Sequence, residues 1–131
     1  MSAKLVRLVA LGLAVGVPAA ALAEGAVKVL RCSVARVCDG AGLCEAGSGE
    51  IEFRMEPQSV EASRAGRYAL HYAGETADMQ ALSDAGPFIW SIGGERHALL
   101  ASSEREWLWH ELSLEPAPKA VIRFLACSFD G

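Results

Sequence analysis

The chain of 131 residues has few of the patterns that mark an enzyme or a metalloprotein. Its four cysteines include no C-x-x-C pair, so the common zinc, redox and haem motifs are absent. It contains no G-x-S-x-G nucleophile turn, and no glycine-rich phosphate loop that leads into a helix. The sequence therefore predicts no catalytic residue, no metal and no cofactor, and we expect a protein that is not an enzyme.

The chain also lacks a basic excess. It has 12 lysines and arginines against 16 acidic residues, a formal net charge of −4. Because a nucleic-acid-binding protein needs a basic face, this balance argues against a nucleic-acid partner. It permits a cationic partner, although many acidic domains are acidic only for solubility.

A long apolar run without charged residues occurs only near the N-terminus. Lys4 and Arg7 form a basic head, residues 8–20 carry no charge, and residues 21–23 read Ala-Leu-Ala. This pattern is typical of a secretory signal peptide over residues 1–23, cleaved after Ala23. We expect export to the periplasm or beyond, with no membrane attachment after cleavage. The mature chain would be a single domain over residues 24–131, with 10 basic and 16 acidic residues and a net charge of −6.

In an oxidising compartment an even number of cysteines is typical of a disulfide framework. Four cysteines allow three pairings, and we favour Cys38–Cys44 together with Cys32–Cys127. The sequence DGAGL between Cys38 and Cys44 accepts a tight turn, which would bring the two cysteines opposite each other. Cys32 and Cys127 each lie in an apolar, strand-like run near one end of the mature chain. Their bridge would join the first and last strands.

Short runs of alternating apolar and polar residues, separated by turn residues, predict β-strands along the mature chain. Strands are expected over about 27–38, 50–56, 66–74 and 119–129, with Pro57 ending the second of them. Residues 86–101 predict a hairpin around Gly93 and Gly94. The segment 74–86 fits either a short strand or a helical turn.

The segment from Ser103 to Leu114 fits a helix or a strand. Ser103 and Glu106 have capping-box spacing, whereas Trp107 and Trp109 alternate with their neighbours as in a strand. We favour the strand because the neighbouring segments are strands. The prediction is an all-β fold, a small antiparallel barrel or sandwich of 7–8 strands, bridged by disulfides. Closure would place the Cys32–Cys127 bridge at the seam.

The three histidines, His71, His97 and His110, show none of the paired spacings of metal or catalytic sites. They lie on three different predicted strands, so a cluster would require the fold to bring them together. An enzyme with a histidine-based site is therefore the weakest of the functional alternatives.

The tryptophans carry the one indication of a binding surface. Tryptophans on strands usually lie in the core. Trp107 and Trp109 must share a face, and if that face points outward they would form a binding patch, with Trp90 and Arg67 as further candidates. If the face points inward, they belong to the core.

Several segments match a known pattern. They are a cysteine in the first mature strand, RYALHY, PFIWSIGGERHALL and a last strand that carries a cysteine. Phe88, Trp90 and Gly93 follow F-W-x-x-G with Ile89 inserted, and ASRAGRY matches part of the loop S-x-S-G-x-R-Y. In these features the sequence resembles the small exported lysozyme inhibitors of the MliC type. The resemblance implies an eight-stranded antiparallel barrel with a disulfide between the chain ends, and inhibition of a lysozyme.

Together these observations predict an exported binding or interaction protein without enzymatic activity. One version is an inhibitor of a cationic protein such as lysozyme. The alternative is a carrier that holds a small apolar ligand inside the barrel, lined by tryptophan and tyrosine. We expect a monomer or a weak dimer.

Overall fold

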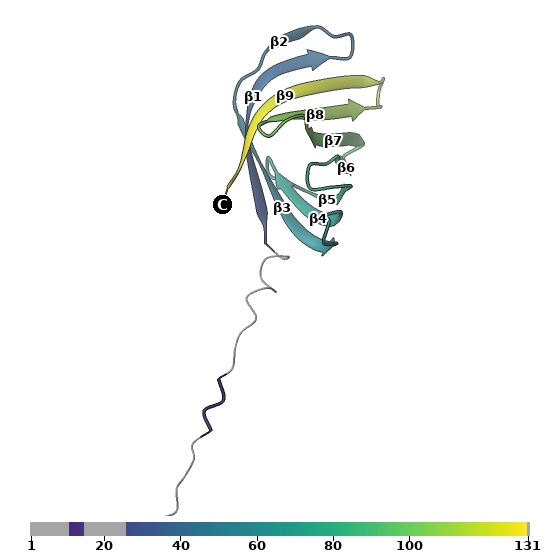
Figure 1. Cartoon of the computed structure of the whole chain (residues 1–131). Helices are drawn as coiled ribbons and strands as arrows, with labels where there is room; N and C mark the ends of the chain where they lie inside the picture. The colour runs from purple at the N-terminus through teal and green to yellow at the C-terminus, as the bar shows by residue number, and fades with distance from the viewer. Residues whose placement is uncertain (1–10, 15–25, 131) are drawn as a thin grey trace, which may run out of the picture.

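The computed structural model describes residues 11–14 and 26–130, and all regular structure in these ranges is β-strand (Figure 1). The predicted signal peptide lies outside the described residues except for residues 11–14. Across the described ranges, no helix meets the length and apolarity that a membrane span requires. The described strands are β1 (Lys28–Asp39), β2 (Cys44–Ala46), β3 (Glu50–Val60), β4 (Gly66–Tyr72), β5 (Glu75–Ala81), β6 (Phe88–Ile92), β7 (Glu95–Ala101), β8 (Glu106–Ser113) and β9 (Lys119–Asp130).

Eight of these strands close into an antiparallel barrel. Each strand from β3 to β8 pairs with the next in sequence, β1 pairs with β3, and β9 returns to pair with β1 along most of its length. The three-residue β2 pairs only with the far end of β1. Figure 1 shows β1 and β9 side by side, with β2 beyond them. The all-β prediction is confirmed, and of the two architectures offered the structure is the barrel.

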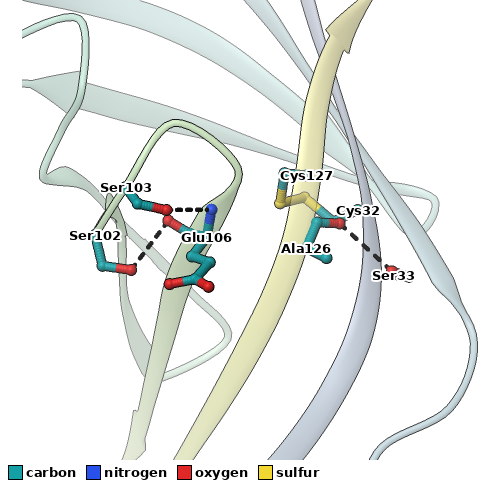
Figure 2. Close-up of a disulfide and its surroundings, with 7 residues drawn as sticks. All are labelled: Cys32, Ser33, Ser102, Ser103, Glu106, Ala126 and Cys127. Carbon is teal, nitrogen blue, oxygen red and sulfur yellow. Dashed lines mark hydrogen bonds between the residues drawn. A yellow bond between two sulfur atoms is a disulfide. The ribbon is translucent and has the colours of Figure 1, made fainter.

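Both predicted disulfides are present. Cys32 and Cys127 are direct cross-strand partners on β1 and β9, with their Cα atoms 4.1 Å apart. Figure 2 shows this bridge at the seam, beside the hydrogen bond from Ser33 Oγ to the carbonyl oxygen of Ala126. Cys38 and Cys44 face each other across the β1–β2 hairpin, with their Cα atoms 4.0 Å apart.

The interior of the barrel is filled by the side chains that alternation points inward. Six of them are completely buried: Phe53, Leu30, Met55, Leu70, Met79 and Leu99. Next to these lies a group of aromatic rings that contact one another, with ring centroids 5.4 to 6.2 Å apart; they are Phe53, Tyr72, Trp90 and Trp109. Rings at these distances fill the space that a carrier would leave for its ligand.

Three local predictions concern the hairpin, the segment 74–86 and Pro57. The hairpin forms as expected, with Gly93 and Gly94 both at positive φ, as a two-residue turn between right-twisted strands requires. The segment 74–86 contains strand β5 and no helical turn. Pro57 does not end its strand, and this prediction is wrong. The register with β4 shifts between Pro57 and Ser59, and β3 continues to Val60, since a bulge accommodates a residue without an N–H.

The segment that begins at Ser103 forms a strand, as favoured. Ser103 Oγ accepts a hydrogen bond from the Glu106 amide at 3.0 Å, and Ser102 Oγ donates to the Glu106 carbonyl at 3.0 Å (Figure 2). These bonds close a turn between β7 and β8 and start β8 at Glu106. The capping-box spacing therefore marks a turn, because the same side-chain bonds serve turns as well as helix starts.

The two disulfides should contribute unequally to stability. The Cys32–Cys127 bridge spans a sequence separation of 95 residues and Cys38–Cys44 a separation of 6. In the loop-entropy description this corresponds to about 4 to 5 kcal/mol for the seam and about 2 kcal/mol for the hairpin. We expect Cys32→Ala with Cys127→Ala to lower the free energy of unfolding, measured with urea, at least about 2 kcal/mol further than Cys38→Ala with Cys44→Ala. Equal losses would contradict this prediction.

Candidate functional site: the acidic mouth of the barrel

One end of the barrel opens into a hollow of about 440 Å³, which we call the mouth. The turns after β4 and after β6 form part of its rim. It is lined by Tyr72, Ala73, Glu75, Ile92, Gly93, Glu95, His97, Trp109, Glu111 and Arg123. Three carboxylates therefore face a single guanidinium, above a floor that is largely aromatic.

The mouth is assembled by alternation within strands and by register between them. Glu95 and His97 are two residues apart on β7, and Trp109 and Glu111 are two apart on β8, so each pair shares a face. His97 pairs across the sheet with Glu111, and Trp109 pairs with Arg123 of β9. These five residues, the His97 cluster, come together because β7, β8 and β9 are consecutive neighbours.

His97 is the polar member of a core that is otherwise apolar, with only 3 % of its surface exposed. The indole Nε1–H of Trp109 donates to its Nδ1 at 3.1 Å, and the ring of Trp90 stacks on it at 5.0 Å and 4°. Since Nδ1 accepts, we assign the proton of the neutral imidazole to Nε2. Nε2 lies 3.3 Å from a carboxylate oxygen of Glu95 without hydrogen-bond alignment, and among the described residues it has no hydrogen-bond partner.

Glu111 and Arg123 form the ion pair of the cluster. Arg123 Nη1 donates to Glu111 Oε2 at 2.7 Å, and the guanidinium carbon lies 4.4 Å from the centre of the Trp109 ring. Such a placement is a cation–π contact. Both groups are partly buried, with side-chain exposures of 25 % for Arg123 and 17 % for Glu111. The pair therefore has a lower dielectric around it than an exposed one.

Burial and charge set the protonation states of the cluster. Burial lowers the pKa of His97 and outweighs the opposite effect of the carboxylates of Glu111 and Glu95. Burial alone would raise the pKa of Glu111, but the hydrogen bond from Arg123 and its positive charge keep this pKa below its ordinary value. The mouth at neutral pH therefore contains a neutral imidazole and a net negative charge.

The predicted tryptophan patch does not form. Trp90, Trp107 and Trp109 have 2, 3 and 7 % of their surfaces exposed, so the alternative in which they face solvent is wrong and the core interpretation is confirmed. Closing the barrel puts their shared face inside, where Trp107 stacks on Phe88 at 6.0 Å. Arg67 is exposed on β4 and lies on the opposite face of the sheet from these rings.

The structure does not bring the three histidines together. His97 points into the barrel, whereas His71 and His110 lie on its outer face. His71 has separate partners there, Thr76 at 3.1 Å and Glu56 at 3.2 Å. A site that combines the three side chains is therefore absent from the described structure.

Three members of the cluster, Glu95, Glu111 and Arg123, were not predicted as site residues. The spacings E-x-H and W-x-E place each pair on one strand face, and this signal is visible in the sequence. Which face points inward, and which strands are neighbours, depends on the register and on closure.

No family model, no curated protein and no solved structure matches this chain.

Acidification should destabilise the protein through His97. Its folded-state pKa is below the ordinary value of 6.5, so the unfolded chain binds a proton at a higher pH than the folded protein does. The free energy of unfolding then falls as the pH drops below 6.5, by about 1.4 kcal/mol for each unit of pKa lowering, and this loss ends at the folded-state pKa. The lowered pKa of Glu111 adds a loss in the same direction below pH 4.5.

The measurement is the urea unfolding free energy between pH 7.5 and pH 5. His97→Gln should show a smaller loss across this range than the wild type, because its side chain does not titrate. His110→Gln, an outward-facing histidine one residue from Glu111, is the matched control and should keep the full loss. If the unfolding free energies of the wild type and His97→Gln fell equally with pH, the destabilisation could not be assigned to His97.

Proposed function

We propose that the protein is an exported binding protein whose mouth receives a cationic group of a protein partner, and that this partner is of the lysozyme type. The observation that carries the proposal is the charge of the mouth, three carboxylates against one guanidinium around an open hollow. The two disulfides support an oxidising compartment, such as the periplasm or the cell exterior.

Two of the carboxylates are available to a partner. Arg123 already binds Glu111, whereas Glu75 is exposed and the Glu95 side chain is 40 % exposed. The apolar lining beside them, which includes Ile92 and Tyr72, lowers the local dielectric and strengthens an ion pair made there. A lysine or arginine that enters the mouth would meet both negative charge and an aromatic surface.

The charge of the whole chain acts over a longer range. With a net charge of −6 expected for residues 24–131, a strongly cationic protein is attracted before contact. The resemblance to lysozyme inhibitors of the MliC type points to the same partner. It would, however, place recognition near ASRAGRY, at the start of β4, whereas the mouth lies at the other end of that strand, beside Tyr72.

The carrier alternative receives no support from the packed interior, and no specific observation favours it. In the described part of the chain the inward side chains already fill the space between the strands.

The proposal is tested by lysozyme inhibition at micromolar concentrations of the purified, oxidised protein. Glu95→Gln and Glu75→Gln should each weaken inhibition about 5- to 10-fold, since each removes one charge from the mouth. Glu104→Gln, an exposed carboxylate in the β7–β8 turn, is the control and should change inhibition less than twofold, roughly the effect of a remote surface charge. Added salt should weaken inhibition by the wild type.

Two results would overturn parts of the proposal. No inhibition at micromolar concentrations would remove lysozyme as the partner. Inhibition that survives both mouth variants but is lost in Arg67→Ala would move the contact to the start of β4, as the resemblance implies.

A further inference from the structure

The floor of the mouth contains a donor set of which the proposed partner contact uses only Glu95. We propose that Glu95, His97 and Glu111 form a site for one divalent transition-metal ion, with Zn²⁺ as the best match. This inference goes beyond the proposed function, because His97 is buried beneath the groups that a protein partner would touch.

The three donors are close enough to share an ion. One ligand atom from each of them lies within 4.8 Å of the others, and each would have to come within about 2 Å of a common ion. One imidazole and two carboxylates leave a fourth position open towards the hollow. An imidazole in the set favours zinc and its transition-metal neighbours over Mg²⁺ and Ca²⁺, which prefer oxygen ligands alone.

The second, independent observation is the state of His97 itself. Its Nε2 is buried and, within the described residues, without an aligned hydrogen-bond partner, and it lies 3.3 Å from a carboxylate oxygen of Glu95. Buried polar atoms in native proteins nearly always have a partner, so an unpaired nitrogen at this position is suited to bind a ligand. The ring is also held in place from both sides, by the stacked Trp90 and by the bond from Trp109.

Two existing hydrogen bonds compete with a metal ion for its ligands. The Trp109 Nε1–H donates to Nδ1, so the neutral ring has its proton on Nε2, where a metal would bind. Metal binding therefore transfers that proton to Nδ1, and the two N–H groups of His97 and Trp109 then oppose each other. Arg123, bonded to Glu111 at 2.7 Å, competes for the second carboxylate.

This competition gives the proposal an unusual signature. Removing the opposing donor by Trp109→Phe should raise Zn²⁺ affinity about tenfold, the cost of one unsatisfied buried donor. A cation held only by exposed carboxylates would be indifferent to this substitution. The same proton shift would alter the environment of Trp109, so its fluorescence should change as Zn²⁺ binds.

The experiment is a calorimetric titration of the metal-free, oxidised protein with Zn²⁺, repeated with Mg²⁺ and Ca²⁺. The wild type should bind one Zn²⁺ and neither of the other ions at the same concentrations. His97→Gln should weaken binding at least about 100-fold, as expected when the imidazole ligand is lost, whereas His110→Gln should leave it unchanged. Cobalt substitution should give the visible absorption of a four-coordinate site in the wild type and in His110→Gln, and not in His97→Gln.

Glu95→Gln, at a partly exposed position, is the second variant and covers the case in which His97→Gln fails to fold; it should also weaken Zn²⁺ binding. No Zn²⁺ binding by the wild type, equal binding by His97→Gln, or weaker binding by a folded Trp109→Phe would each overturn the metal site. The lysozyme assay separates the two proposals, because His97→Gln should lose Zn²⁺ and keep inhibition.

Discussion

The pairing of β1 with β9 is the constraint on which the rest of the structure depends. It joins the two ends of the folded chain over ten residue pairs, and the Cys32–Cys127 bridge fixes its register. Once this pair forms, its register decides which side chains point into the barrel, because a one-residue slip would exchange the inner and outer side chains of a strand. The aromatic core, the burial of the tryptophans and the position of Arg123 beside Trp109 all follow from closure.

Most of the fold could be predicted from local patterns, because period-two alternation and paired turn glycines act over a few residues. The tryptophans show what local patterns cannot predict. Alternation establishes that Trp107 and Trp109 share a face, but only the closed sheet decides that the face is the inner one. Pro57 shows a second limit, because its missing N–H can be accommodated by a bulge in β3 as readily as by the end of a strand.

The His97 cluster could not be predicted for the same reason. Its members come from β7, β8 and β9, and they meet only through the cross-strand register that pairs His97 with Glu111 and Trp109 with Arg123. It also departs from the apolar rule that holds for the rest of the interior. Burying the imidazole of His97 and partly burying the Glu111–Arg123 ion pair costs desolvation energy that an apolar core would not, and such departures concentrate at functional sites.

The small strand β2 has a consequence for behaviour at high concentration. Among the described strands it alone has a single hydrogen-bonded neighbour, so one edge of this short, exposed strand is unpaired. An edge of three residues offers too few free amides to recruit a strand from another molecule. By holding β2 against β1, the Cys38–Cys44 bridge keeps the backbone of Arg36, Val37 and Cys38 paired, so that this part of β1 offers no free edge to another molecule.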